Sequence, residues 1–483
     1  MASQFWPQRF AVTVRSSRRA VCIHSILVPV VLSCGVDETL NPVRVVDEVP
    51  SLNPAVDLDP APGRVVVSLV ARELETRFAG DSPKVWAYLD AEAPAPDRAV
   101  PGPLIEANVG DEVVVRIQND LLESTTVHFH GLRLDSMMDG AANHGDSIRP
   151  GESFEARFIA RDPGVFWYHP HVHADEQIER GMYGVLVVRD RAAEPGERIF
   201  VLDDVNVEGG EIVVTPTMED LEAGRVGDRL LVNGGEPASL LVAPGSVERW
   251  TFISAANARH LVLRLEGSTF DIVAGDAFTL PVRRPATELL IAPGERWTIE
   301  VPLAGEPGEM LELSATTLEG GHSSEKSTLA RPLMDVRLVE GEPTLVTPLL
   351  PTPLAPFEVP PAEVRTLELS SRIEAGEKPR FYINGEAWPF NEPLCGRAGD
   401  LEFWDVVNRE DAEHPFHVHG MFFQVLDDGG SPDESLGWKD TLRVPAQSSR
   451  RIALQLEPGD WMFHCQIPEH AEAGMMGEIR VEP

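Results

Sequence analysis

One short pattern recurs three times along the chain, and it restricts the possible fold more than any other feature. ANVGDEVVVRIQN begins at Ala107, VAPGSVERWTFISA begins at Val242, and GRAGDLEFWDVVN begins at Gly396. In each copy a turn at Gly precedes a strand in which apolar and polar residues partly alternate, as they do in a strand with one buried face. The repetition predicts three β-sandwich domains of similar type.

The chain after residue 64 has the same character throughout. Short segments rich in Val, Ile and Leu are separated by Gly, Pro, Asp or Asn, and no long amphipathic helix stands out. This pattern predicts an all-β protein of Greek-key sandwiches or barrels. Pro-rich joins near 192–197 and at 343–364 predict domains at 64–192, 193–342 and 365–483, with 343–364 as an extended surface linker.

The N-terminus is typical of an export signal over residues 1–34, followed by a linker at 35–63. A basic stretch precedes the short apolar run Ala20–Leu32, and Arg18-Arg19 resembles a twin-arginine signal. VLSC resembles a bacterial lipobox with Cys34 as the lipidated residue. We therefore expect a periplasmic, cell-envelope or extracellular protein, and its one candidate membrane attachment is a lipid on Cys34. The alternative is an uncleaved extension.

The charge balance excludes some partners. Asp and Glu number 77 against 41 Lys and Arg, which gives a net charge of −36. Such a field repels nucleic acid and anionic lipid and attracts cations. Two explanations stay open: solubility of an exported protein, or steering of a positively charged substrate.

Most of the 14 histidines lie in the four segments HFHG, FWYHPHVH, HPFHVHG and HCQIPEH. Residues two apart in a strand share a face, so each His-x-His pair presents two imidazoles in one direction, which suits chelation. One such pair is unremarkable on a protein surface, whereas three pairs together predict a shared metal site. The candidate ligands are His128, His130, His169, His171, His414, His417, His419, His464 and His470.

A second ligand set combines nitrogen and sulfur. Cys465 with His414, His470 and Met475 offers a thiolate, two imidazoles and a thioether, which favours an electron-transfer copper site with Met as a weak axial ligand. Zinc would need no methionine. Met475 is preferred to Met476 because it follows His470 by five residues, after Gly474. A disulfide from Cys465 to Cys395 is rejected because Cys465 lies among these ligands.

With these segments the chain resembles a three-domain multicopper oxidase, the family of laccases, bacterial cuprous oxidases and bilirubin oxidases. The four copper-binding segments occur in the family's order, and the resemblance covers about residues 64–483. It is supported by PGPLIEANVGDEV, LLVNG, ANARHLVLRLEG, APGERW and GWKDTLRV. The resemblance implies three cupredoxin-like domains and up to four copper ions, one of type 1, one of type 2 and two of type 3.

The same resemblance implies a role for each candidate ligand. His414, Cys465 and His470 would hold the type 1 copper, with Met475 axial. A trinuclear cluster would lie between the first and third domains. Its ligands would be His128 and His417 for type 2, His171, His419 and His464 for one type 3 copper, and His130 and His169 for the other. The family's HCH triplet supplies the last ligand, and here Gln466 stands at that position.

Gln466 has three interpretations. It ligates weakly through its side-chain oxygen, it binds a metal-bound water, or it leaves the cluster partly empty. In the triplet, Cys465 points to one side of the strand, while His464 and residue 466 point to the other side. His173 is expected to share a strand face with His169 and His171, which makes it a candidate replacement ligand. The alternative interpretation is that His173 lies on the surface and binds no metal.

Proton supply departs from the family pattern as well. Asp139 in DSMMDG matches the family's acid near the type 2 copper, and its alternative role is a turn residue before Gly140. The Glu that often follows the second type 1 histidine is replaced by Ala471, and Glu472 comes one residue later. On a helical turn that shift rotates the carboxylate by about 100°. Cys465, His464 and Asp139 are the candidate catalytic residues.

Two functions follow from these observations. The first is an oxidase that couples one-electron oxidation of a phenol, an aromatic amine or a metal ion to reduction of O2 to water. The second is a copper-binding or electron-transfer protein with an impaired cluster. We expect a monomer acting on a small reductant, and a Met-rich insertion is not evident. A cationic donor is one hypothesis because the candidate rim is acidic, with Glu410, Asp411, Glu413, Glu469 and Glu472.

Overall fold

The computed structural model describes residues 48–59, 61–141, 147–276, 278–318, 331–354, 357, 360–374 and 376–483. The expected export signal at 1–34, including Cys34, lies outside these residues. Among the helices that are described, none has the length and the apolar composition that a membrane crossing needs.

The first domain consists of two four-stranded sheets. One sheet has the order β2 (Lys84–Asp90), β1 (Arg64–Glu75), β4 (Glu112–Asn119), β6 (Ser153–Ile159), and the other has the order β3 (Gly102–Asn108), β8 (Gly184–Arg189), β7 (Gly164–His169), β5 (His128–His130). Their inward faces form one apolar core that includes Val115, Phe129 and Phe166. A three-residue 3-10 turn, η1 (Ser136–Met138), follows β5.

The second domain packs a six-stranded sheet on a five-stranded sheet. The larger sheet has the order β12 (Arg229–Val232), β9 (Glu197–Val205), β14 (Ser246–Ser254), β19 (Arg296–Leu303), β16 (Phe270–Gly275), β17 (Phe278–Ala286). The smaller sheet has the order β13 (Ala238–Val242), β21 (Arg331–Leu338), β20 (Met310–Thr317), β15 (Leu261–Leu265), β18 (Leu289–Ile291). A short ribbon joins β10 (Val207–Glu208) to β11 (Glu211–Ile212).

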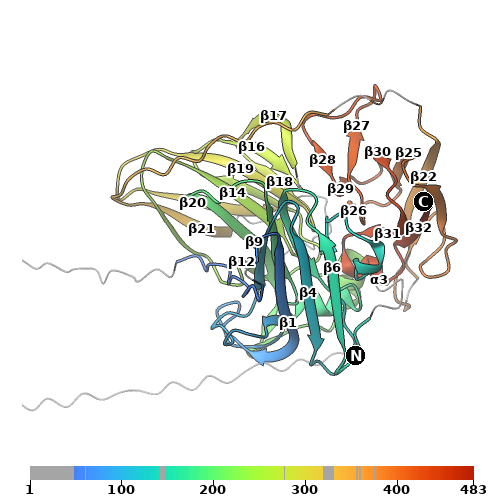
Figure 1. The fold of residues 1–483 in the computed structure, drawn as a ribbon, viewed down its shortest axis with the longest axis horizontal. Coiled ribbons are helices and arrows are strands. Elements are labelled where there is room, and N and C mark those ends of the chain that lie inside the picture. The colour runs from blue at the N-terminus through green and yellow to red at the C-terminus, as the bar shows by residue number, and fades with distance from the viewer. Residues whose placement is uncertain are drawn as a thin grey trace, which may run out of the picture. The chain divides into compact units, whose positions relative to one another are not determined.

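The third domain repeats the six-on-five arrangement. The larger sheet has the order β23 (Arg380–Ile383), β22 (Glu363–Arg372), β25 (Leu401–Asn408), β30 (Ser449–Gln455), β27 (Phe423–Leu426), β28 (Trp438–Lys439). The smaller sheet has the order β24 (Leu394–Arg397), β32 (Met476–Glu482), β31 (Gly459–Cys465), β26 (His414–Val418), β29 (Thr441–Val444). Figure 1 shows these strands in orange to red and the strands of the first domain in blue and teal.

The sequence repeat corresponds to one equivalent strand in each domain. β4, β14 and β25 each pair in parallel with the first long strand of their domain. Each follows a glycine in the left-handed region, Gly110, Gly245 or Gly399, where a side chain would be strained. The prediction of an all-β chain with three sandwiches is therefore confirmed, while the exact domain limits stay a prediction.

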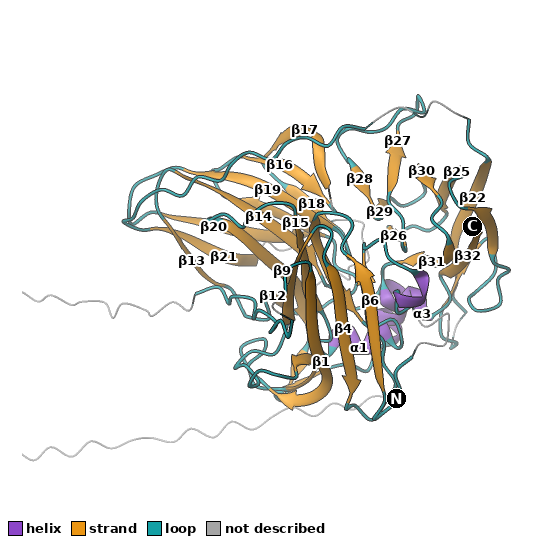
Figure 2. Ribbon diagram, in the orientation of Figure 1, coloured by secondary structure: helices purple, strands orange, loops and turns teal. Residues whose placement is uncertain are grey.

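Helices are few and short among the described residues, and they lie close together (purple in Figure 2). They are α1 (Ala174–Glu179), α2 (Met218–Ala223) and α3 (Pro468–Glu472). Each helix comes from a different domain, and both α1 and α2 contact α3. Since α3 contains the last three residues of the HCQIPEH segment, all three domains contribute to the surroundings of that segment.

Candidate metal centres

The Cys465 group lies entirely inside the third domain. The Sγ atom of Cys465 is 3.5 Å from Nδ1 of His414 and 3.8 Å from Nδ1 of His470, and all three residues are fully buried. Strand alternation explains the arrangement, because Phe416 on β26 pairs with Cys465 on β31. His414, two residues before Phe416, shares its face and so points toward the sulfur.

Met475 and Met476 occupy different cores. Met475 is fully buried in the same apolar core as Cys465, and its backbone carbonyl accepts the Cys465 N–H at 3.0 Å. Met476 packs instead in a separate cluster with Met462 and Ala471. The structure thus places Met475, and not its neighbour, on the Cys465 side. Cys465 and Cys395 are both free thiols, one buried and one exposed.

The remaining histidines converge from the first and third domains. On β5 and β7, His128 pairs directly with His169, and on β26 and β31 His417 pairs with His464. Ligand atoms within 4.8 Å of one another form these groups: His128, His417 and His419; His128, His130 and His169; His171, His419 and His464. The sequence-predicted cluster histidines are therefore brought together, without exception, in one region, where all are buried but the half-buried His171.

One group has three Nε2 atoms facing one another. Nε2 of His464 lies 3.2 Å from Nε2 of His171 and 2.9 Å from Nε2 of His419. The far nitrogens of two of these rings are held, because Nδ1 of His464 lies 2.8 Å from the Cys465 carbonyl and Nδ1 of His419 lies 2.7 Å from Oδ2 of Asp139. Donation from Nδ1 leaves the Nε2 lone pairs directed at a common point.

His128 and His417 form a matched pair. Their Nδ1 atoms each lie 2.9 Å from a backbone carbonyl, of Asp139 and Asp440 respectively. Their Nε2 atoms are buried and have no hydrogen-bond partner among the described residues. A buried lone pair without a partner is costly unless a ligand or metal satisfies it, so this pair fits a metal ion.

Gln466 belongs with the group that contains His130 and His169. His169 holds Nδ1 2.9 Å from the Pro170 carbonyl and leaves Nε2 buried without a partner in the described structure. The side-chain oxygen of Gln466 is likewise buried and unpaired there. Gly294 lies against both Gln466 and His130: a Cβ at that glycine would lie 2.6 Å from Gln466 Cγ and 3.2 Å from His130 Cε1. The amide therefore lies beside the His130 and His169 group, at the position expected for the missing histidine.

Burial favours the neutral form of several of these imidazoles. It lowers the pKa of His464 to about 4 and the pKa values of His169 and His171 well below the usual range. Neighbouring imidazoles add to the effect on His417 and His419, because a second positive charge nearby would be unfavourable. Burial also raises the pKa of the Cys465 thiol. Neutral imidazoles are the form that binds metals, and a metal is what deprotonates a buried thiol.

The second domain supplies a buried charge network that the sequence did not reveal. Both guanidinium Nη atoms of Arg296 lie 2.6 Å from the Asp440 carboxylate, and these two side chains are fully buried. Oδ1 of Asp440 is 3.2 Å from Nε2 of His130, and its backbone carbonyl holds His417. Asp276 accepts the Asp440 N–H at 2.8 Å, and Lys439 bridges Asp276 to Glu295. APGERW and GWKDTLRV therefore meet at the cluster.

Asp139 contacts two of the cluster histidines and also ends a turn. Its carboxylate contacts His419, and Oδ1 lies 3.4 Å from Nδ1 of His128. It also ends the η1 turn before Gly140, which has φ +71° and where a Cβ would lie 1.9 Å from the Val127 carbonyl. Only glycine fits that position, and the tight turn fixes Asp139 between two histidines.

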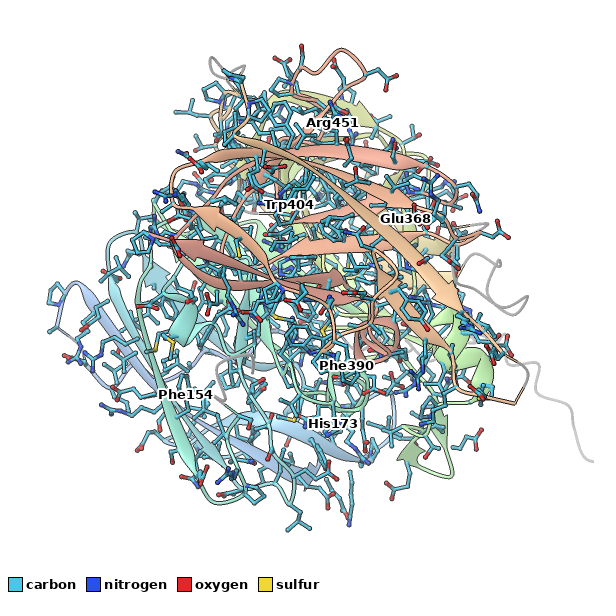
Figure 3. The ribbon with its side chains drawn as sticks, turned by 90° about the vertical axis from the view of Figure 1, so that its right-hand side faces the viewer. Phe154, His173, Glu368, Phe390, Trp404 and Arg451 are labelled. Atoms are coloured by element: carbon cyan, nitrogen blue, oxygen red, sulfur yellow. The ribbon has the colours of Figure 1, made fainter. Side chains whose placement is uncertain are left out.

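Two other candidates point elsewhere. His173 is exposed in the left-handed region as the N-cap of α1, and Figure 3 shows it on the first-domain side, away from Trp404 in the third domain. It belongs to none of the ligand groups among the described residues. Glu472 accepts the Ala174 N–H at 3.0 Å, so its carboxylate is directed to α1, while Ala471 packs on Met462.

The acidic residues beside the Cys465 group are mostly engaged. Glu413 pairs with Arg443 at 2.6 Å, Glu410 binds Ser371, and Asp411 accepts from Gln447. Glu469 is buried, with Asn257 donating to it at 2.8 Å, and burial raises its pKa to about 7. Their charges are thus largely committed to structural contacts.

Three cupredoxin-like domains with clustered histidine and cysteine ligands define the class of protein. Sequence models described as Multicopper oxidase match residues 86–193, 199–309 and 358–483. Multicopper oxidase MmcO of Mycobacterium tuberculosis is 31% identical over 422 residues, which cover 78% of this chain and 80% of that protein. The chain belongs to the multicopper oxidase family.

Two further similarities are informative. A solved structure, the metallo-oxidase from Campylobacter jejuni, has a TM-score of 0.78 at 24% identity and covers 91% of this chain and 96% of its own. That likeness supports the fold. Cell division protein FtsP of Escherichia coli is 28% identical over 407 residues, covering 79% of this chain and 84% of that protein. The relatives therefore include a protein named for a role other than oxidation.

Proposed function

We propose that this chain couples one-electron oxidation of a phenol, an aromatic amine or a metal ion to reduction of O2 to water. The observation that carries the proposal is the pair of adjacent ligand sets, with Cys465 among one and His464 among the other. Copper, once bound, would supply one-electron chemistry at the cysteine set and oxygen reduction at the histidine sets. A soft thiolate with two imidazoles suits copper, and imidazole-only groups suit it too.

The protein's own residues prepare both sets. Cys465 and His464 are consecutive, and the His464 ring is held on the Cys465 carbonyl, so one short stretch of backbone joins the two sets. Asp139 orients His128 and His419, and Asp440 orients His130 and His417. Burial excludes water and keeps the rings in the binding form. In this proposal His414, Cys465, His470 and Met475 hold type 1 copper.

The assignment of the trinuclear cluster follows the family resemblance, and the clustering of these histidines supports it. His128 and His417 would hold type 2 copper, and His171, His419 and His464 one type 3 copper. His130 and His169 would hold the other, with Gln466 in third place. The unpaired Oε1 of Gln466 supports a weak ligand or a partner for a metal-bound water.

A second candidate function is a copper-binding or electron-transfer protein whose cluster reduces O2 poorly. Gln466 in the third group and the similarity to a cell division protein favour it. The seven remaining cluster histidines favour the oxidase, because a site without selection for oxygen reduction would be expected to lose more than one ligand. We propose that the protein acts outside the cytoplasm, as the N-terminal sequence predicts.

Copper loading tests the two candidates together. The copper-free protein is titrated with copper and followed by absorption and paramagnetic resonance, and oxygen uptake is then measured with a phenol and an amine donor. The oxidase predicts a blue protein that consumes oxygen. A blue protein without oxygen uptake supports the second candidate, and a protein that gives no blue band contradicts both.

A further inference from the structure

His130 is held by side chains, whereas two neighbouring rings are held by the main chain. Nε2 of His130 lies 3.0 Å from the hydroxyl oxygen of Thr441 and 3.2 Å from Oδ1 of Asp440. Its Nδ1 atom is buried and has no partner among the described residues. His128 and His417 show the reverse arrangement, with Nδ1 on a backbone carbonyl and Nε2 unpaired there. The orientation of His130 therefore depends on two side chains of the third domain.

Both of these side chains act as acceptors toward His130. The Thr441 hydroxyl donates to Oδ1 of Asp440 at 2.9 Å, so only its lone pairs are left for the imidazole. The Asp440 carboxylate accepts two bonds of 2.6 Å from Arg296, a pairing that favours its ionised form, which has no proton to give. Nε2 of His130 therefore carries the hydrogen, and the lone pair of Nδ1 is left for a metal ion.

Arg296 holds Asp440 from the second domain, and a glycine of the first domain makes room for the pair. Arg296 and Asp440 are both fully buried. Gly131, the last residue of HFHG, has φ +85°, and a Cβ there would lie 2.6 Å from Oδ2 of Asp440 and would also clash with Arg296. The contacts that end on His130 therefore come from all three domains.

We propose that this hold on His130 compensates for the histidine that is missing at position 466, an inference that rests on the proposed function of the histidine groups. The amide of Gln466 is the weak member of its group, so copper there depends on two imidazoles. Two imidazoles bind tightly when their positions are fixed before the metal arrives, because little ordering entropy is then lost on binding. Thr441 is a positioning residue for His130, and Arg296 acts on the same ring through Asp440.

Removal of the Thr441 hydroxyl should affect His130 more than His417. Nδ1 of His417 lies 3.1 Å from that hydroxyl, but it keeps the Asp440 backbone carbonyl at 2.9 Å, which no side-chain substitution removes. His130 would keep only Oδ1 of Asp440, at 3.2 Å, and that oxygen would have lost the Thr441 donor. We therefore expect selective loss of the copper ion of the Gln466 group, with the type 2 copper retained.

Copper titration of a double-mutant cycle tests the proposal. The unmodified chain, Thr441→Val, Gln466→His and the combined variant are titrated from the copper-free state, with bound copper counted by metal analysis and type 2 copper followed by paramagnetic resonance. Thr441→Val should weaken one ion by about 10- to 100-fold, the usual effect of removing a partner behind a metal-binding histidine, and should leave the type 2 signal intact. In the Gln466→His background the same substitution should cost less than about threefold, because a third imidazole then holds the ion.

Two variants serve as controls. Thr441→Ser keeps the hydroxyl and should bind copper as the unmodified chain does. Thr251→Val also removes a buried hydroxyl, one paired with Thr298 at 2.9 Å in the larger sheet of the second domain, and should leave copper binding unchanged. The urea midpoint of each copper-free variant separates weaker copper binding from loss of the fold. If Thr441→Val fails to fold, Arg296→Lys replaces it in the cycle, since lysine keeps the charge but not the two-point contact.

The outcomes separate this proposal from the proposed function. Unchanged copper binding in Thr441→Val, an equal loss in both backgrounds, or loss of the type 2 signal alone overturns the compensation. An unmodified chain that leaves the Gln466 group empty overturns it as well, and supports the second candidate function. An unmodified chain that binds no copper at any histidine group contradicts the proposed function itself.

Discussion

The Cys465 group and the Gln466 group lie one residue apart on the same strand end, yet they are built differently. Around Cys465 the soft ligand set is complete, and Phe381 and the Glu222 carbonyl fix His470. Around Gln466 two histidines and an unpaired amide oxygen share the site, supported by Gly294. The half expected to accept electrons is therefore complete, and the half expected to use them has a substitution in one of its groups.

The comparison also shows what the second domain does. Its described residues offer no ligand to either group, but they shape both: α2 covers His470, Gly294 makes room for Gln466, and Arg296 neutralises Asp440 beside His130. The departure from the ligand pattern that the family resemblance implies thus lies at residue 466.

The largest expected effect comes from removing the thiolate. Cys465→Ser should abolish the blue band completely and lower the copper content by about one ion per chain, because the oxygen of serine is a poor substitute for a soft thiolate ligand. Absorption and metal analysis measure both. Cys395→Ser is the control, since that thiol is exposed and distant from the ligand groups in sequence. A blue Cys465→Ser protein would remove the basis for the type 1 assignment.

The next effect concerns the support beneath the histidine groups. Arg296→Leu leaves the Asp440 carboxylate buried without its guanidinium, and removing one partner of a buried pair costs about 3–5 kcal/mol. We expect a large drop in the urea midpoint of the copper-free protein. Arg264→Leu, which breaks the exposed pair with Glu288, should cost about 0–1 kcal/mol. Equal midpoints for the two variants would show that the Arg296 pair contributes little.

Restoring the missing imidazole tests the Gln466 group directly. Gln466→His should raise copper affinity at one site about tenfold or more, since imidazole binds copper better than an amide oxygen. Oxygen uptake should rise with it if the amide limits the cluster. Copper titration and oxygen uptake measure these effects.

The control for that experiment is Gln466→Leu, which keeps the volume and removes the oxygen. If Leu and Gln behave alike, the amide neither ligates nor binds a metal-bound water. If Gln466→His instead lowers oxygen uptake, the surrounding residues have adapted to the amide. The amide then does not weaken the Gln466 group relative to the Cys465 group.

Local patterns predicted the strands and the ligands, because both depend on short spacings. A His-x-His pair places two rings on one face of a strand, as on β5 and at the end of β26. The Gly turns before β4 and β14 need only local backbone freedom. The four ligand groups followed from that same spacing together with the family resemblance.

Contacts between distant segments were not predictable in this way. Arg296 and Asp440 are in different domains, and neither APGERW nor GWKDTLRV indicates that they meet. The cover over His470 comes from a six-residue polar helix, which has no hydrophobic period to mark its position. The direction of Glu472 depends on α1, from the first domain. These contacts follow from the packing of three domains, which one local pattern cannot specify.

The smallest effect separates general stability from the metal groups. Asp203 is buried away from the ligands, accepts the Tyr183 hydroxyl at 2.6 Å, and has its pKa raised by burial to about 8. Between about pH 4 and pH 8 the folded chain keeps this proton while the unfolded chain releases it, so stability falls as pH rises, by at most about 1.4 kcal/mol per pH unit. Asp203→Asn should flatten that slope.

Unfolding of the copper-free protein between about pH 5 and pH 8 measures the slope in both chains. The neighbouring Glu179 also has its pKa raised by burial, so part of the slope should remain in Asp203→Asn. A slope unchanged by the substitution would mean that Asp203 is already ionised at neutral pH. If the slope flattens as expected, copper binding by Gln466→His can be compared with the unmodified chain in an Asp203→Asn background, where pH acts on the ligands with less interference from folding stability.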